Sequence, residues 1–120
     1  MKVLIVEDSM LYRKTIVKYL KEHLSEVEFI LAEDGQEGYE LYKAENPDFI
    51  LLDLLIPELS GQELLAKIRA EDQQIKVVVI SADVQKIVQE EVKKLGITKF
   101  INKPFTEEKA FKLAKMMKDD

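Results

Sequence analysis

The sequence predicts an α/β domain built on an open, doubly wound parallel sheet of five strands with five helices. Three observations predict it. Short apolar runs recur at fairly even intervals, most of them are rich in β-branched or aromatic residues, and segments with helical spacing separate them. Three of the runs are nearly continuous rather than alternating, which is typical of parallel strands buried on both faces. Repeated strand–helix units with right-handed crossovers then give the doubly wound arrangement.

The five predicted strands share short length and apolar character. They are Val3–Val6, Phe29–Ala32, Phe49–Leu52, Val77–Ile80 and Lys99–Asn102. In the strand order 2-1-3-4-5 the sheet is flavodoxin-like, and its first and third strands are neighbours where the order reverses. Residues 1–120 are expected to form one domain, because 120 residues are too few for two domains of ordinary size.

The first three helices are indicated by apolar periodicity and by one clear cap. The segment Met10–Leu24 carries an apolar face made of Ile16, Val17, Leu20 and Leu24. A second helix, from about Gln36 to Ala44, is weakened by Gly38. The sequence Ser60-Gly61-Gln62-Glu63 is a capping box, so a third helix is expected to begin there.

The last two helices are indicated by candidate N-caps. Asp83 is placed to cap a fourth helix with Gly96 at its C′ position, and the apolar stripe of this helix is Val84, Ile87, Val88, Val92 and Leu95. Thr106 is placed to cap a fifth, whose first turn carries Glu107 and Glu108 at the positive end of the helix dipole. The stripe of this fifth helix is Ala110, Leu113, Ala114 and Met117.

Composition narrows the function classes. The chain has 18 Lys and Arg against 23 Asp and Glu, a net charge of −5, and no Cys. The charge argues against a nucleic-acid partner, and the lack of Cys excludes thiolate chemistry and disulfides. The N-terminal apolar run is too short for a signal peptide, and no run approaches the length that spans a membrane. A cytoplasmic location is therefore expected.

The strand ends carry the candidate chemistry, because sites in such sheets lie beyond the carboxyl ends of the strands. Glu7 and Asp8 follow the first strand and Asp53 follows the third, so the three acids are expected to converge. Carboxylates gathered in this way repel one another unless a cation is present, and a hard divalent ion answers that need. Mg²⁺ is the expected metal, with Mn²⁺ as an alternative. Ser81 and Lys103 end the fourth and fifth strands.

Asp53 differs from the other acids because a buried strand anchors its backbone. A carboxylate in that setting can attack a phosphoryl group and give an aspartyl phosphate. The chemistry needs charge neutralisation and positioning more than a strong base, and the metal, the Lys103 ammonium and the Ser81 hydroxyl would supply both. Pro104 follows Lys103 directly and marks either a simple turn or a cis peptide that aims Lys103 inward.

Five motifs in order resemble the receiver domain of two-component response regulators, from Lys2 to the last helix. They are Val3–Asp8, Ala32–Glu37, Asp53–Pro57 with Gly61, Ser81-Ala82, and Phe100–Phe105. The resemblance implies a single receiver domain that accepts a phosphoryl group on Asp53 from a histidine kinase. It assigns the metal to Asp8, Asp53 and the Leu55 carbonyl, with Glu7 acting mostly through water. It also implies that Ser81 and Lys103 bind the phosphoryl group, and that the Lys103–Pro104 bond is cis.

The resemblance also implies a switch. Ser81 moves toward the phosphoryl group, and the aromatic residue three positions before the lysine, here Phe100, fills the space that is left. Because a Phe ring loses no polar partner on burial, we expect Phe100 to favour its inward position even without phosphate. The readout surface would be the fourth helix, fifth strand and fifth helix, where lysines and glutamates mix. Leu55 and Asp83 flank the route of the hydrolytic water and would affect the lifetime of the signal.

The expected biological role is that of a monomeric response regulator that acts on a protein target in trans. A chemotaxis role at the flagellar motor switch is one reading, and a phosphorelay intermediate that serves a histidine phosphotransfer protein is the other. Such a protein is not an enzyme acting on a separate substrate, although it catalyses its own phosphorylation and autodephosphorylation. No membrane partner is expected.

Three other functions agree less well with the sequence. A dinucleotide-binding site needs glycines after the first strand, whereas Glu7-Asp8-Ser9-Met10 stands there and would repel a pyrophosphate. An aspartyl-phosphate phosphatase usually needs a second acid two residues after the nucleophile, where this chain has Leu55. A phosphorylation-independent binding module is disfavoured because Asp8, Asp53, Ser81 and Lys103 are all present.

Overall fold

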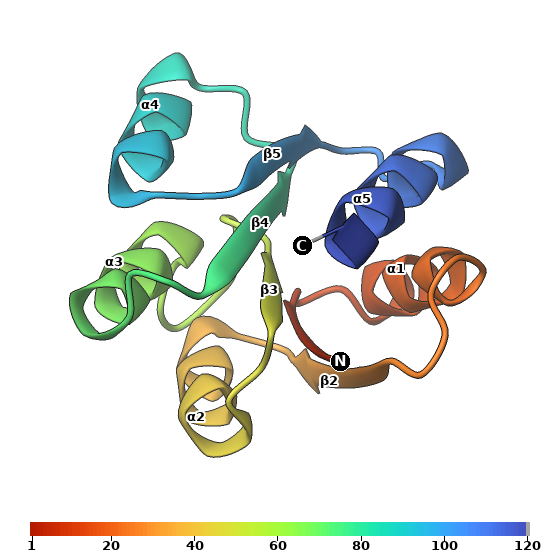
Figure 1. Cartoon of the computed structure of the whole chain (residues 1–120). Coiled ribbons are helices and arrows are strands. Elements are labelled where there is room, and N and C mark those ends of the chain that lie inside the picture. The colour runs from red at the N-terminus through yellow and green to blue at the C-terminus, as the bar shows by residue number, and fades with distance from the viewer. Residues whose placement is uncertain (120) are drawn as a thin grey trace.

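The sheet has five parallel strands in the order β2-β1-β3-β4-β5 (Figure 1), which confirms the predicted fold class and strand order. The computed structural model describes residues 1–119. In chain order the elements are β1 (Lys2–Val6), α1 (Met10–Lys21), β2 (Glu28–Ala32), α2 (Gly35–Glu45), β3 (Phe49–Leu52), α3 (Gly61–Glu71), β4 (Lys76–Ser81), α4 (Lys86–Leu95), β5 (Lys99–Asn102) and α5 (Glu107–Asp119).

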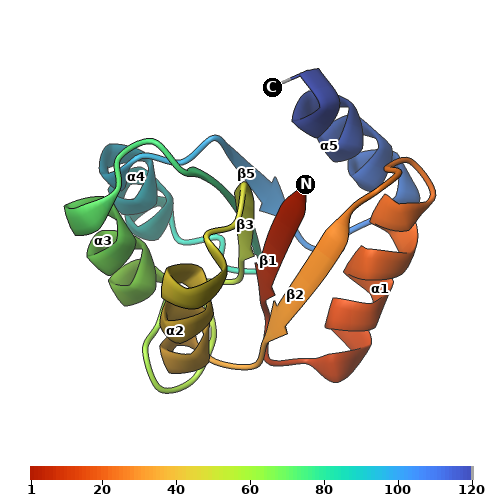
Figure 2. The same ribbon diagram turned by 60° about the horizontal axis from the view of Figure 1, so that its bottom comes forward.

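The helices cover both faces of the sheet, and each face has its own apolar core. Helices α1 and α5 lie on one side, and α2, α3 and α4 lie on the other (Figures 1 and 2). Along β1, Val3 and Ile5 belong to the first core, while Leu4 and Val6 belong to the second. Because successive side chains of a strand point to opposite faces, a strand between two layers must be apolar at every position. This explains the continuous apolar runs.

The register of the strands brings their carboxyl ends to one edge of the sheet. Val6 pairs with Leu52, and Leu52 pairs with Val79. The ladder continues one step past β3, since the Asp53 N–H donates to the Val6 carbonyl at 3.0 Å. The residues that follow these strands therefore leave the sheet side by side.

Two of the predicted caps are present as hydrogen bonds. The Ser60 hydroxyl accepts the N–H of Glu63 at 3.2 Å, and the Glu63 carboxylate accepts the N–H of Ser60 at 3.1 Å, which completes the capping box of α3. The Thr106 hydroxyl accepts the N–H of Lys109 at 3.2 Å at the start of α5. Helix α2 forms despite Gly38, whose Cα packs so closely against Val6 that a Cβ there would crowd it.

The predicted start of the fourth helix is wrong. Helix α4 begins at Lys86, and its N-cap is Gln85, without a side-chain cap. The Asp83 carboxylate instead accepts the N–H of Gln85 at 2.9 Å and closes a turn before the helix. Val84 therefore precedes the helix and is exposed, and Ile87 is exposed too because it lies about 100° around the helix from buried Val88.

The first helix is shorter than predicted. Helix α1 ends at Lys21, so Leu24 lies beyond it, although its side chain still packs in the core that α1 and α5 cover.

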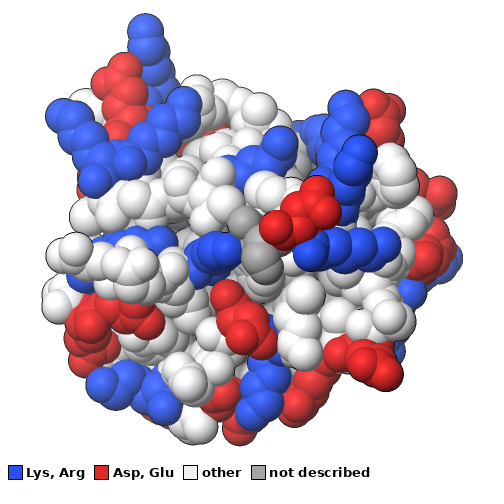
Figure 3. Space-filling view, viewed as in Figure 1, with Lys and Arg blue, Asp and Glu red and all other residues white. Residues whose placement is uncertain are grey.

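Within residues 1–119, no helix combines the length and the apolar character needed to cross a membrane. Acidic and basic side chains are interspersed on the face of the molecule seen in Figure 3.

Candidate functional site

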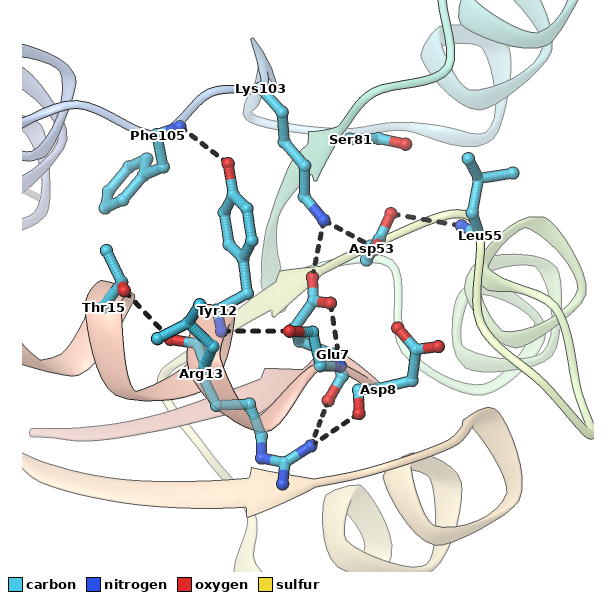
Figure 4. A network of polar contacts seen from close by, with 12 residues as sticks. Glu7, Asp8, Tyr12, Arg13, Thr15, Asp53, Leu55, Ser81, Lys103 and Phe105 are labelled. Carbon is cyan, nitrogen blue, oxygen red and sulfur yellow. Dashed lines mark hydrogen bonds and ion pairs between the residues drawn. The ribbon is translucent and has the colours of Figure 1, made fainter.

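Three carboxylates gather at the carboxyl ends of β1 and β3, as the sequence predicts. Carboxylate oxygens of Glu7, Asp8 and Asp53 lie within 4.8 Å of one another (Figure 4). Glu7 and Asp53 are nearly buried, at 2% and 4% exposure, while Asp8 is exposed. The cluster is therefore a shallow acidic site, with two acids held inside the protein and one facing solvent.

Lys103 reaches into this cluster from the loop after β5. Its Nζ donates to the Glu7 Oε2 at 2.9 Å and to the Asp53 Oδ2 at 3.0 Å. Burial alone would lower the pKa of Lys103, but hydrogen bonds and the charges of the two acids outweigh burial and raise it. Lys103 is therefore a permanent cation in the site.

The site shifts the titration of Glu7. Burial of its carboxyl raises the pKa of Glu7 from 4.5 to about 7, and the negative charge of Asp53 adds to this rise. The hydrogen bond from Lys103 and the N–H of Ser9, 3.1 Å from Glu7 Oε1, act in the opposite direction. These two hydrogen bonds therefore offset the effects of burial and of the Asp53 charge only in part.

The backbone that follows β1 is held in place by contacts that the sequence did not predict. Ser9 caps α1 by accepting the N–H of Tyr12 at 3.2 Å. Arg13, buried in α1, donates to the carbonyl oxygens of Glu7 at 2.7 Å and of Asp8 at 3.2 Å. The Ser before an apolar helix was a usable signal for the cap. Nothing in the local pattern distinguishes Arg13 or Tyr12 from ordinary helix residues.

Asp53 is held by the loop that follows β3. Its Oδ1 accepts the N–H of Leu55 at 3.1 Å, and the Leu55 side chain is exposed. Gly61, at the start of α3, donates its N–H to the Leu54 carbonyl at 3.1 Å. A Cβ on Gly61 would collide with Leu54 Cα and with the Asp53 carbonyl oxygen, so only glycine permits this approach. The capped end of α3 therefore packs directly against the backbone that carries Asp53.

Ser81 ends β4 beside the acids but has a different partner. Its side chain is fully buried, and its hydroxyl oxygen accepts the N–H of Asp83 at 3.2 Å. Its carbonyl accepts the N–H of Lys103 at 3.0 Å, so Ser81 and Lys103 are joined through the backbone. The peptide bond between Lys103 and Pro104 is cis, the isomer that the resemblance implies.

Phe100, the expected switch residue, is half-buried on β5 and packs against the core under α2, α3 and α4. It is not turned out into solvent, which is the arrangement that would have contradicted an inward preference. Phe100 also lines an open hollow of about 250 Å³ between β5 and α5, together with Lys99, Lys109 and Lys112.

The donor set fits a hard divalent cation. All three acids offer oxygen ligands, which Mg²⁺ and Mn²⁺ prefer, and no thiolate or imidazole belongs to the cluster. Three carboxylates face a single ammonium group, so a dication would bring the local charge near neutrality. The same arrangement places a buried carboxylate, Asp53, next to the Lys103 ammonium, a cation that could stabilise charge on a transferring phosphoryl group.

Comparison with known proteins points the same way. The family model described as "Response regulator receiver domain" matches residues 3–115. The chain is 39% identical over 106 residues to the chemotaxis protein CheY of Listeria monocytogenes, covering 88% of this chain and 87% of that protein.

Solved structures agree with this match. The Mn²⁺-bound form of response regulator Rcp1 aligns with a TM-score of 0.84 and 26% identity, over 98% of this chain and 91% of that one. The phosphorylated cyanobacterial phytochrome response regulator RcpA aligns with a TM-score of 0.81 and 27% identity, over the same shares. With its fold, its acid cluster and its match over residues 3–115, the chain belongs to the receiver domain family of response regulators.

Proposed function

We propose that the chain is a phosphorylation-driven signalling switch in which Asp53 accepts a phosphoryl group from the phosphohistidine of a histidine kinase or a histidine phosphotransfer protein. One observation carries the proposal. Asp53 is a backbone-anchored carboxylate at 4% exposure, with the Lys103 ammonium at 3.0 Å and two further acids within metal-binding reach. Charge neutralisation and positioning are the main requirements of phosphoryl transfer.

The transfer itself is a displacement at phosphorus. A carboxylate oxygen of Asp53 forms the new P–O bond, and the P–N bond to the donor imidazole breaks. The electron pair of that bond stays on the imidazole nitrogen. The imidazole leaves as neutral histidine when its other nitrogen carries a proton; otherwise the released nitrogen takes a proton from water. Lys103, already bonded to Asp53 Oδ2, is placed to donate to the incoming phosphoryl oxygens.

Asp8, Asp53 and the Leu55 carbonyl would hold Mg²⁺, with Glu7 acting mostly through water. When bound, the metal supplies positive charge that offsets the acids and the transferring group. The donor chemistry of the cluster supports this assignment. The Mn²⁺-bound structure of Rcp1 gives Mn²⁺ as an alternative.

Phosphorylation would be read out through Ser81 and Phe100. A phosphoryl group adds about −1.5 to −2 charges and three strong acceptor oxygens. The Ser81 hydroxyl would leave the Asp83 N–H for one of these oxygens, and Phe100 would pack into the space behind it. The surface formed by α4, β5 and α5 would then change its fit for a target protein.

For the biological setting, we propose a cytoplasmic, monomeric regulator in chemotaxis or motility, with a protein target such as the flagellar motor switch. Its likeness to the chemotaxis protein CheY of Listeria monocytogenes supports this role. The alternative is a phosphorelay intermediate. Binding of the phosphorylated chain to a motor switch protein, measured beside binding to a histidine phosphotransfer protein, separates the two.

The decisive experiment is intact-mass spectrometry after incubation with acetyl phosphate and Mg²⁺. We expect one phosphoryl adduct in the wild type, none in Asp53→Asn, and none in EDTA. Asp48→Asn removes an exposed acid at the opposite end of the sheet and should behave as the wild type. Because rapid hydrolysis could hide an adduct, the samples are also titrated with beryllofluoride, a stable acyl-phosphate mimic. If neither a phosphoryl adduct nor beryllofluoride binding is detected, a phosphorylation-independent binding module becomes the better interpretation.

A further inference from the structure

We propose that Tyr12 is a positioning residue for Lys103, holding its ammonium with the ring and the loop that carries it with the phenol oxygen. The inference deepens the proposed function on which it rests, because Lys103 is the group placed to bind the phosphoryl oxygens. Tyr12 lies in the first turn of α1, more than ninety residues before Lys103 in the sequence. In Figure 4 its ring stands beside the Lys103 side chain, with its hydroxyl toward Phe105.

The first contact is between the ammonium and the ring face. The Lys103 Nζ lies 4.0 Å from the centroid of the Tyr12 ring. The negative face of an aromatic ring attracts a cation, and the attraction grows where water is excluded. The Lys103 side chain is only 16% exposed, so the contact lies in a largely dry setting. The ring therefore restrains the ammonium through a contact separate from its bonds to the acids.

The second contact is between the phenol oxygen and the loop after β5. The Phe105 N–H donates to the Tyr12 hydroxyl oxygen at 3.0 Å. Phe105 is 4% exposed and packs in the core between α1 and α5. One tyrosine thus fixes both ends of the Lys103 segment, the head group directly and the backbone two residues later.

These contacts form part of a closed cycle of four residues beside the acids. Glu7 accepts from Lys103 through Oε2 and from the Ser9 N–H through Oε1. The Ser9 hydroxyl accepts the N–H of Tyr12, and the Tyr12 ring contacts the Lys103 ammonium. A displacement of any member must therefore strain its neighbours. Side-chain contacts thus couple the start of α1 to the loop after β5, although β1 and β5 are not neighbours in the sheet.

The aromatic contact suits the task that Lys103 has to perform. When a phosphoryl group arrives on Asp53, the ammonium must exchange its bonds to Asp53 and Glu7 for bonds to phosphoryl oxygens. A hydrogen-bonded partner would lose its geometry during that move, whereas the attraction of a ring face is broad in direction. Tyr12 can therefore keep hold of the ammonium before and after the transfer.

The test compares Tyr12→Phe, which keeps the ring, with Tyr12→Leu, which removes it. Tyr12→Met is a second variant that retains bulk, in case the leucine variant does not fold. Tyr39→Leu, in α2, is the matched control for the loss of a half-buried tyrosine. Measured quantities are the rate of phosphorylation by acetyl phosphate, the Mg²⁺ affinity, and the NMR signals of the Lys103 ε-methylene and the Phe105 amide.

We expect Tyr12→Leu and Tyr12→Met to phosphorylate about 10-fold more slowly than the wild type, and Tyr12→Phe within about 3-fold of it. Mg²⁺ affinity should stay within about 2-fold in all three, because Lys103 is not a metal ligand. The ε-methylene of Lys103 should show an upfield ring-current shift in the wild type and in Tyr12→Phe only. Exchange of the Phe105 amide should quicken in all three variants, since each loses the phenol oxygen.

Equal rates in wild type and Tyr12→Leu would overturn the inference, as would a parallel loss of rate and Mg²⁺ affinity, which indicates general disruption of the site. If the wild type itself takes no phosphoryl group, the proposed function fails instead. The ring-current shift of Lys103 then decides the positioning role alone: an unshifted methylene in the wild type refutes it, and a shift that depends on the ring supports it.

Discussion

Removal of the Glu7 carboxylate should abolish a pH dependence of stability that the metal-free protein otherwise shows. The folded structure raises the pKa of Glu7 from 4.5 to about 7, chiefly through burial. Asp8, Asp53 and Lys103 are the charged groups that lie beside it. Because the folded pKa lies above the unfolded one, the folded state binds more protons between these values. The stabilisation that comes from protonated Glu7 is therefore fully present below the unfolded pKa, and it is lost as the pH rises through the folded pKa.

The size of the effect follows from the shift. Each pKa unit corresponds to about 1.4 kcal/mol, so the full shift is worth about 3 kcal/mol. About 2 kcal/mol of that should be lost between about pH 5 and about pH 7.5, where the folded protein must give up the proton that burial favours. Lys103 contributes no slope in this window, because the acids raise its pKa. Glu7→Gln keeps the shape of the side chain and removes the titration.

The assay is urea unfolding followed by far-UV circular dichroism, in EDTA, at several pH values across this window. We expect the free energy of unfolding of the wild type to decline relative to that of Glu7→Gln by about 2 kcal/mol. Glu33→Gln, which alters an acid whose side chain is 72% exposed, should retain the wild-type slope. Parallel curves for the wild type and Glu7→Gln would refute the reasoning, since they would show that Glu7 is ionised at no cost in the folded state.

Two further predictions concern the backbone that carries the acids. Gly61→Ala places a Cβ against Leu54 and the Asp53 carbonyl, and should lower the free energy of unfolding by about 1–3 kcal/mol in urea titrations; an unchanged midpoint would show that the loop yields easily. Arg13→Gln removes the clamp on the carbonyls after β1, and should weaken Mg²⁺ binding about 10-fold by isothermal titration calorimetry. Wild-type affinity in that variant would mean that Arg13 serves folding alone.

The strand ends were predictable from the sequence because burial on two faces leaves a plain signature. Each apolar run is bounded by a polar residue, and parallel strands must end at a common edge. Asp53 and Lys103 could therefore be placed together although fifty residues separate them. The caps at Ser60 and Thr106 were predictable for a similar reason, since each depends on residues within one turn.

The failures have equally physical causes. Asp83 carries the side chain of an N-cap, but the same carboxylate can close a turn onto its own backbone two residues later, and here it does. Sequence spacing does not distinguish these outcomes. Arg13 and Tyr12 were missed because their partners are carbonyl oxygens and a loop amide that only the packing of α1 against the sheet brings near.

The assembly of the site from distant strand ends sets the time at which chemistry can begin. During synthesis, Glu7, Asp8 and Asp53 emerge long before Lys103, and the acids then lack the ammonium that faces them in the finished fold. Pairing of β4 with β5 places the loop that carries this cation beside the acids. Under the proposed function, a chain whose β5 has not yet docked would lack the cation that binds the phosphoryl oxygens, and its site would not yet be ready to receive that group.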